Sequence, residues 1–216
     1  MQRKHREALE DYLTTIYRLE EVFGVAHTND IAKELGVSPA TVSKILSKLE
    51  MRGLVKRLKY HGAKLTDEGR GIAEQAVRKH RILEVLLKSL GFNNYEAHRY
   101  AHEMEHIPSN VIERIYEFLN KPKFCPHGNP IPRSGAVVHK LPSLSNAETE
   151  KCYRVMRIAG EFSEPLKVTA ELGIEIGTKL CVENKTSSVL TLIKDNEKVV
   201  LELNIAKFIY VEEVKQ

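Results

Sequence analysis

Six side chains of the kinds that bind transition metals gather near the middle of the chain: His80, Glu84, His98, His102, Glu105 and His106. The last four are spaced i, i+4, i+7 and i+8, which places them along one face of an α-helix. The first two are one helical turn apart and belong to the preceding helix. Imidazole nitrogens and carboxylate oxygens at such spacings are ligands for first-row divalent metals. The sequence therefore predicts a metal site on two neighbouring helices.

The same segment also matches H-E-x-x-H, the signature of zinc proteases, in which two histidines bind zinc and the glutamate acts as general base. This alternative makes the chain a metallohydrolase that uses His102, Glu103 and His106. Pro108 follows almost at once, so the extended form of the motif is absent. The motif also leaves the earlier histidines without a role. The two hypotheses need different carboxylates, Glu103 for a hydrolase and Glu105 for a binding site.

The segment before these helices has the pattern of two short helices joined by a tight turn. The first helix is expected over residues 29–35, with Thr28 as its N-cap. The second is expected to begin with Ser38 as N-cap and Pro39 in the first helical position, an arrangement typical of helix starts. Its apolar side chains recur at helical spacing, and its other face carries short and basic side chains. The pattern predicts a helix-turn-helix with its recognition helix second.

A basic β-hairpin is expected directly after this pair, over residues 54–66. Between Ser38 and Lys64 the chain carries seven basic residues against one acid, Glu50. Such an excess suggests a polyanionic partner, although a solvated basic face is the alternative. Helix pair and hairpin together predict a winged helix-turn-helix that binds DNA. The residues expected to meet bases and phosphates are Ser38, Pro39, Ala40, Thr41, Ser43, Lys44, Lys48, Arg57, Lys59 and Lys64.

The composition is that of a folded chain of several domains. The 216 residues are 42% hydrophobic and 29% charged, so the chain can bury a core and is not disordered. No apolar run approaches the ~20 residues that a membrane span needs, and the charged first residues lack the apolar stretch of a secretory signal. We therefore expect a cytoplasmic protein. Three cysteines, Cys125, Cys152 and Cys181, are odd in number and widely spaced, which argues against a disulfide scaffold.

The chain is expected to be mainly helical in its first part and β-sheet at its end. Further helices are predicted over residues 9–19, 68–90, 94–107 and 109–119. Residues 121–135 contain four prolines and two glycines, which predict an irregular connection. Residues 151–216 have five short strand patterns and one helical turn, at 167–172, which suggest a small barrel.

Motifs in a fixed order extend over nearly the whole chain: EDYLTTIY, VSPATVSKILSKLEMRGLV, LTDEGRGIA, RKHRILEVLL, HRYAHEMEH, CPHGNPIP and ELGIEIG. In these motifs the chain resembles the diphtheria-toxin-repressor family of metal-dependent transcriptional regulators. The resemblance implies a homodimer that binds Fe²⁺ or Mn²⁺, then binds a palindromic operator in double-stranded DNA and represses genes of metal homeostasis. No catalytic residues are expected.

The resemblance also implies a mainly α fold with a C-terminal β domain. A winged helix-turn-helix domain is expected over residues 1–72 and a helical dimerisation and metal-binding domain over residues 73–132. A linker over residues 133–150 would lead to an SH3-like (FeoA-like) domain over residues 151–216. The C-terminal domain could in turn bind the proline-rich segment, as SH3-like folds do.

The family's primary metal site corresponds to Asp11, His102, Glu105 and His106, and its ancillary site to His80, Glu84 and His98. A further ancillary ligand from the C-terminal domain would be Glu161 or Glu164, and the sequence does not choose between them. The iron branch has Met and Cys where Asp11 and His102 stand. Asp11 matches the manganese branch, which has a second acid where this chain has Thr14. Two separate single-metal sites are therefore expected rather than a two-metal cluster.

Asp11 belongs to the first helix of the DNA-binding domain, whereas its partner ligands belong to the dimerisation domain. Metal is therefore expected to join two bodies and to fix the spacing of the two recognition helices in the dimer, because half-sites lie about 34 Å apart. Cys125 and His127 in the CPHG motif are close enough in sequence to share a metal. A proline-rich turn is the favoured interpretation of that motif.

Overall fold

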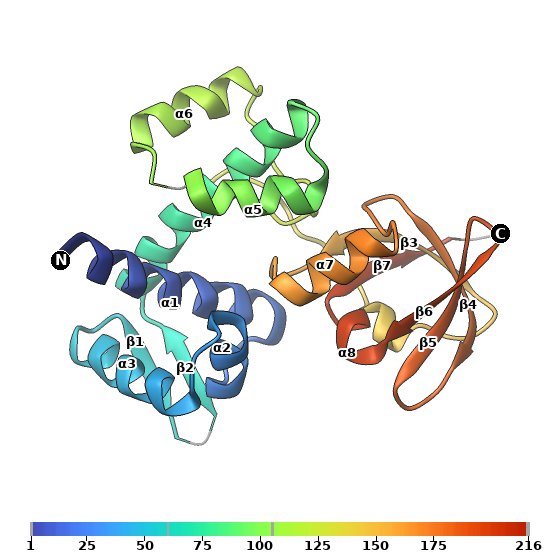
Figure 1. Ribbon diagram of the computed structural model, residues 1–216, viewed down its shortest axis with the longest axis horizontal. Helices are drawn as coiled ribbons and strands as arrows, with labels where there is room; N and C mark the ends of the chain where they lie inside the picture. The colour runs from blue at the N-terminus through green and yellow to red at the C-terminus, as the bar shows by residue number, and fades with distance from the viewer. Residues whose placement is uncertain (1, 60, 105, 215–216) are drawn as a thin grey trace. The chain divides into compact units, whose positions relative to one another are not determined.

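The computed structural model describes residues 2–59, 61–104 and 106–214, with side chains from Leu9 onward. The chain divides into two compact units, residues 1–80 and 81–216. The division falls inside one long helix, α4 (Asp67–Ser89), which therefore contributes to both units (Figure 1). Among the described residues, no helix has the length and apolarity that crossing a membrane requires.

The first unit is a three-helix arrangement followed by a hairpin. Its elements are α1 (Gln2–Phe23), α2 (Thr28–Leu35), α3 (Pro39–Met51), β1 (Val55–Leu58), β2 (Gly62–Leu65) and the first part of α4. The helix α2 packs against both α1 and α3. Apolar side chains at helical spacing form the core, among them Leu13, Ile16, Ile31, Val42, Leu46 and Leu49. The predicted helix-turn-helix and hairpin are therefore confirmed.

The two helix starts in this unit behave differently. Ser38 is the N-cap of α3, and its Oγ accepts the backbone N–H of Thr41 at 3.1 Å, with Pro39 in the first helical position, as predicted. The helix α2 is present as predicted, but the prediction of Thr28 as its N-cap is wrong. His27 occupies the N-cap position there without a side-chain cap, and Thr28 is already helical. The extended backbone of His27 (φ −76°, ψ 144°) makes it the last residue outside the helix.

Replacing Ser38 with alanine is expected to destabilise the protein by about 1 kcal/mol, because the first turn of α3 loses the acceptor for one of its free N–H groups. Urea denaturation followed by circular dichroism measures the change. Ser38→Asp, which keeps an oxygen acceptor, is the control and is expected to stay within about 0.5 kcal/mol of the parent. An equal loss in both variants would contradict the capping role.

The hairpin β1–β2, which we call the wing, is antiparallel with Val55 opposite Leu65 and Leu58 opposite Gly62. On its other side β2 forms a bridge with Ala26. Gly62 has a φ of +95°, and a Cβ at this position would lie 2.0 Å from the carbonyl oxygen of Ala26. Only glycine permits this backbone conformation and this close approach. The bridge therefore holds β2, whereas β1 is the outer strand.

The second unit begins with a helical layer made by the end of α4, α5 (Asn94–Met104) and α6 (Ser109–Phe118). Its core is made by Ile82, Leu83, Leu87, Ala97, Ala101, Ile112, Tyr116 and Ile131. The expected helix over 94–107 is shorter than predicted, because α5 ends at Met104 and the N–H of Ile107 closes a turn onto the carbonyl of Met104. Pro108 follows, and a residue before proline avoids the helical conformation.

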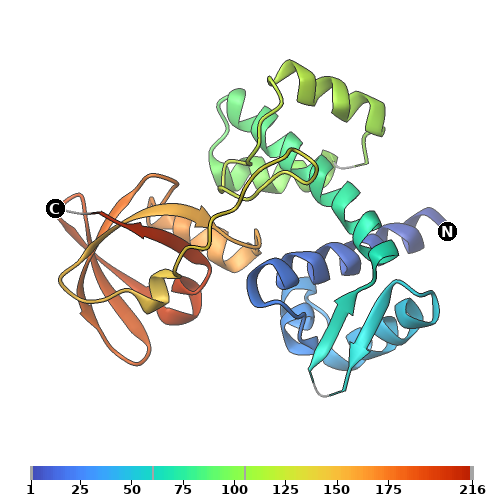
Figure 2. The same ribbon diagram turned by 180° about the vertical axis from the view of Figure 1, so that it is seen from behind.

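The end of the second unit is a five-stranded antiparallel sheet in the order β6-β5-β4-β3-β7. Its elements are β3 (Cys152–Ile158), α7 (Ser163–Glu171), β4 (Lys179–Lys185), β5 (Val189–Lys194), β6 (Glu197–Glu202), α8 (Leu203–Ala206) and β7 (Ile209–Glu213), preceded by the short 3-10 helix η1 (Leu144–Asn146). The five predicted strands are confirmed. The helical turn expected over 167–172 is α7, which begins four residues earlier. Figure 2 shows the long connection from α6 to β3, drawn in yellow.

Two of the three cysteines are paired, contrary to the sequence-based expectation. Cys152 on β3 lies directly opposite Cys181 on β4, and the two form a disulfide. Their separation of 29 residues is no obstacle, because antiparallel pairing places the two strands side by side. Cys125 is a free, buried thiol.

Candidate DNA-binding surface and metal site

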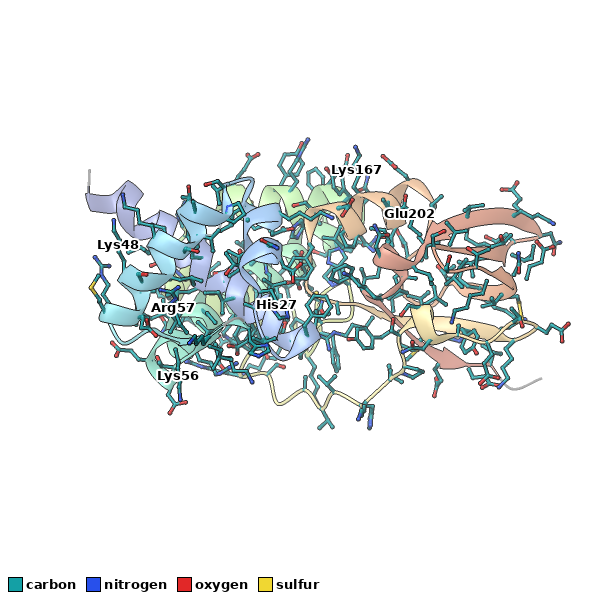
Figure 3. The ribbon with its side chains drawn as sticks, turned by 90° about the horizontal axis from the view of Figure 1, so that it is seen from below. His27, Lys48, Lys56, Arg57, Lys167 and Glu202 are labelled. Carbon is teal, nitrogen blue, oxygen red and sulfur yellow. A yellow bond between two sulfur atoms is a disulfide. The ribbon has the colours of Figure 1, made fainter. Side chains whose placement is uncertain are left out.

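The predicted DNA-contacting residues are exposed or half-buried on α3 and the wing. Val42, Leu46 and Leu49 are buried on the opposite face of α3 and fix the helix on its scaffold. The outer face is left to short and basic side chains. Lys48 on α3 and Arg57 on β1 can be followed in Figure 3. The unit thus presents a recognition helix and a basic wing on its surface.

Glu84 is the centre of a buried group of metal-ligand side chains in the second unit. It lies on α4 and is fully buried. Its Oε1 lies 2.8 Å from Nδ1 of His98, on α5, and 3.3 Å from Nδ1 of His127. The two imidazole rings meet edge to face with centroids 6.0 Å apart. One carboxylate oxygen therefore contacts the imidazoles of two histidines.

The CPHG motif delivers His127 and Cys125 to this place. The motif forms a turn in which the N–H of Gly128 is donated to the carbonyl of Cys125. The turn is attached to the end of β3, because the N–H of Ile158 is donated to the carbonyl of His127 and the Nδ2 of Asn129 donates to the carbonyl of Ile158. The two interpretations of the motif, a proline-rich turn and a pair of metal ligands, are thus compatible. The backbone forms a turn, and the side chains of Cys125 and His127 lie in a cluster of ligand residues.

Glu161 completes the group from the segment that follows β3. It is fully buried, and its carboxylate accepts from Nε of Arg81 at 2.7 Å and from a terminal nitrogen of Arg81 at 3.2 Å. The thiol of Cys125 lies 3.3 Å from Oε1 of Glu161. Glu164, the other residue considered as a further ligand, is exposed on α7. The structure therefore favours Glu161.

Burial and the two acids set the protonation of the group. Burial raises the pKa of the Cys125 thiol well above its usual value, and the charges of Glu84 and Glu161 raise it further. For His127, burial lowers the pKa, but the charge and hydrogen bond of Glu84 and the charge of Glu161 outweigh it and the pKa is raised. Without metal, Cys125 is therefore a neutral thiol beside two paired acids.

Four ligand atoms, from Glu84, Cys125, His127 and Glu161, lie within 4.8 Å of one another, and all four residues are buried. The Nε2 atom of His127 is buried and has no hydrogen-bond partner among the described residues. Two carboxylates, an imidazole and a thiol are a donor set that suits a first-row divalent cation. The residues present therefore fit such a metal.

The other residues of the predicted sets are placed as follows. His80 is buried on α4, one turn before Glu84. His102 is exposed on α5, with its ring centroid 4.7 Å from that of His98. Asp11 is exposed on α1, in the other unit. His106 is exposed and lies past the end of α5, so it does not continue the helical face as predicted, and Glu105 lies outside the described residues.

Of the predicted ancillary set, Glu84 contacts His98, and His80 has a ligand atom within 4.8 Å of those of His98 and His102. The sequence did not indicate Cys125 and His127 as neighbours of Glu84. A signal was present: a thiol and an imidazole two residues apart, in a chain already rich in ligands. The prolines around them favoured a simple turn, and no periodic pattern connects this turn to α4 or to Glu161. Their proximity depends on long-range packing.

Comparison with known proteins bears on both the DNA-binding surface and the candidate metal site. Residues 5–63 match the family model "Iron dependent repressor, N-terminal DNA binding domain". Residues 66–133 match "Iron dependent repressor, metal binding and dimerisation domain". The diphtheria toxin repressor of Corynebacterium glutamicum is 31% identical over 97% of both chains. The iron-dependent repressor IdeR of Mycobacterium leprae is 30% identical over 96% of this chain and 98% of that protein.

Solved structures agree. The manganese regulator SloR matches with a TM-score of 0.80 and 33% identity, covering 95% of this chain and 98% of that one. The metal-dependent transcriptional regulator MtsR matches with a TM-score of 0.81 and 30% identity, with the same coverage. All these relatives are transcription regulators, and nothing in them supports the hydrolase alternative. This chain, accordingly, is a transcription regulator rather than an enzyme, and it belongs to the diphtheria toxin repressor family of metal-dependent regulators.

Proposed function

We propose that this protein is a metal-activated repressor that binds a palindromic operator as a homodimer and controls iron or manganese homeostasis in the cytoplasm. The observation that carries the proposal is the buried group around Glu84 in a chain that also presents a winged helix-turn-helix. The group brings four ligand atoms within 4.8 Å of one another, and the buried Nε2 of His127 has no hydrogen-bond partner among the described residues. A bound cation would satisfy this buried nitrogen, which is costly to leave without a partner. Homologues dependent on iron and on manganese support Fe²⁺ or Mn²⁺ as that cation.

We assign the roles of the residues as follows. The primary metal site comprises Asp11, His102, Glu105 and His106, and the ancillary site His80, Glu84 and His98, with Cys125, His127 and Glu161 added around Glu84. The bound cation supplies a fixed positive centre for these ligands. The DNA-contacting set is Ser38, Pro39, Ala40, Thr41, Ser43, Lys44, Lys48, Arg57, Lys59 and Lys64, of which the wing residues meet phosphates, which position the protein, and the helix residues meet base edges.

The domain limits that we propose are 1–72 for DNA binding, 73–132 for dimerisation and metal binding, 133–150 for the linker and 151–216 for the SH3-like domain. The two family matches, which end at residues 63 and 133, support the first two. Because α4 continues through the first limit, the DNA-binding domain is connected to the metal-binding helices by an unbroken helix. Metal that orders the second domain is thereby coupled to the DNA-binding domain.

The test is a DNA-binding titration with Mn²⁺, Fe²⁺, Co²⁺ and Zn²⁺, each with a chelator control and at one stated salt concentration. The probe is the duplex that the Mn²⁺-loaded protein selects from random-sequence DNA. We expect a two-fold symmetric duplex, bound in a metal-dependent manner. Equal affinity for this duplex in the presence and absence of chelator would refute metal activation.

Replacing Asp11 with alanine is expected to keep the fold but to reduce metal-stimulated binding of the selected duplex by about tenfold or more. The physical reason is that Asp11 belongs to the DNA-binding domain and its proposed partner ligands to the other, so its loss uncouples metal binding from DNA binding. A gel-shift titration with Mn²⁺ measures the change, and Asp67→Ala, an exposed acid in the first turn of α4, is the control. Unchanged metal dependence in the Asp11 variant would refute this coupling.

A further inference from the structure

The single acid of the basic segment, Glu50, has a definite partner in the structure. Its Oε1 accepts the backbone N–H of Arg57, on strand β1 of the wing, at 2.9 Å. Glu50 lies in the last turn of α3, where a negative charge is opposed by the helix dipole. On helix grounds and on DNA-binding grounds an acid is unfavourable here. The hydrogen bond from the wing to Glu50 offsets this unfavourable placement.

The side chain of Arg57 also returns to the recognition helix. A terminal nitrogen of its guanidinium donates to Oγ of Ser47 at 2.8 Å. The hydroxyl of Ser47 in turn donates to the backbone carbonyl of Ser43, one turn earlier, at 3.0 Å. Since the hydroxyl proton is used in that bond, a lone pair of Oγ faces the guanidinium. Arg57 is thus held by α3 through both its backbone and its side chain.

Side chains do not fill all the space between the wing and the helices beside it. An open hollow of about 590 Å³ lies between the start of α2, the helix α3 and the wing, and both Glu50 and Arg57 line it. The strand β2 is held by its bridge to Ala26, but β1 is the outer strand, and the N–H that Arg57 gives to Glu50 points away from β2. Glu50 therefore satisfies an edge N–H that a neighbouring strand would otherwise take.

We propose that Glu50 and Ser47 are positioning residues for DNA recognition: they hold Arg57 and the wing beside the recognition helix, so that helix and wing meet the operator as one surface. The proposal rests on the proposed function, since it concerns the discrimination of the operator from other double-stranded DNA. Its two residues act through Arg57 and carry no DNA contact of their own.

Two opposite effects of Glu50 allow a decisive test. Electrostatically, an acid near DNA phosphates weakens binding to every sequence, so its removal strengthens binding to any duplex. As a positioning residue, Glu50 strengthens binding only to the operator, because only specific contacts need a fixed geometry. The ratio of operator affinity to affinity for a scrambled duplex therefore separates the two effects.

The experiment compares Glu50→Ala with Glu50→Gln in the full-length Mn²⁺-loaded protein, at one salt concentration, on the selected duplex and on a scrambled duplex of equal length. Glutamine keeps the oxygen acceptor and removes the charge, so both affinities rise and their ratio stays within about twofold of the parent. Alanine removes the acceptor, so scrambled DNA is bound more tightly but the operator about fivefold more weakly. Equal ratios in the two variants would overturn the proposal.

A double-mutant cycle tests the Ser47 contact. Ser47→Ala is expected to weaken operator binding about fivefold in the parent and by less than about twofold when Arg57 is already methionine. Ser47→Thr keeps the hydroxyl and is expected to bind like the parent. Additive effects of the two substitutions would overturn the contact's role. If the parent protein does not prefer the selected duplex over the scrambled one, the proposed function itself fails, an outcome distinct from a preference that the variants leave unchanged.

Discussion

Replacing Glu84 with glutamine is expected to lower the affinity of the proposed ancillary site for Mn²⁺ on the order of 100-fold and to weaken metal-dependent operator binding. Glu84 is the residue on which the buried group converges, with two imidazoles on one of its oxygens and Cys125 and Glu161 within ligand distance. Removing a ligand costs at least as much as removing one of its outer hydrogen-bond partners, which alone costs 10- to 100-fold. Isothermal titration calorimetry measures the metal affinity.

The matched control is Glu68→Gln, which removes an exposed acid from the first turn of the same helix and is expected to leave metal affinity unchanged. Circular dichroism checks the fold, because glutamine is isosteric with glutamate and fills the same space. An unaltered metal affinity in the Glu84 variant would show that the group around it is structural, and that Mn²⁺ binds only at the proposed primary site.

Replacing Arg81 with methionine is expected to destabilise the metal-free protein by about 3–5 kcal/mol. Arg81 and Glu161 are both fully buried, and the guanidinium also donates to the carbonyl of Pro130 at 2.5 Å. Removing one partner of a buried pair leaves the other as an uncompensated charge, which is far more costly than the pair itself. Urea denaturation with chelator present measures the loss.

Two further variants make the interpretation of that loss unambiguous. Lys88→Met, at a half-exposed position on the same helix, is expected to change stability by less than about 0.5 kcal/mol. The double variant Arg81→Met/Glu161→Leu removes both charges, and it is expected to recover most of the stability. If the double variant is no more stable than the single one, the cost comes from packing rather than from the stranded acid.

Local patterns allowed the fold to be predicted from the sequence. Ser38 and Pro39 marked the start of the recognition helix, and alternation after residue 151 marked the strands. The two wrong local predictions also have local causes. Thr28 has a side chain that can cap a helix, but its backbone is already helical. The helix α5 ends at Met104, before Pro108, so His106 does not continue the helical face of His98 and His102.

The candidate metal site was predicted only in part, because half of it is not local. Glu84 and His98 belong to helices whose periodicity is visible in the sequence. Cys125 and His127 belong to an irregular turn, and Glu161 belongs to the segment after a strand. Neither segment has a helical or strand periodicity from which side-chain positions could be predicted. The pairing of Cys152 with Cys181 was missed for the same reason, since it depends on strand register.

The attachment of the CPHG turn to the end of β3 has a consequence for synthesis of the protein. Glu161 follows that strand, and the sheet that anchors the strand includes β7, the final strand of the described chain. A nascent polypeptide on the ribosome therefore exposes α3 long before the buried group around Glu84 is complete, because Glu161 and the strands that hold it are made later.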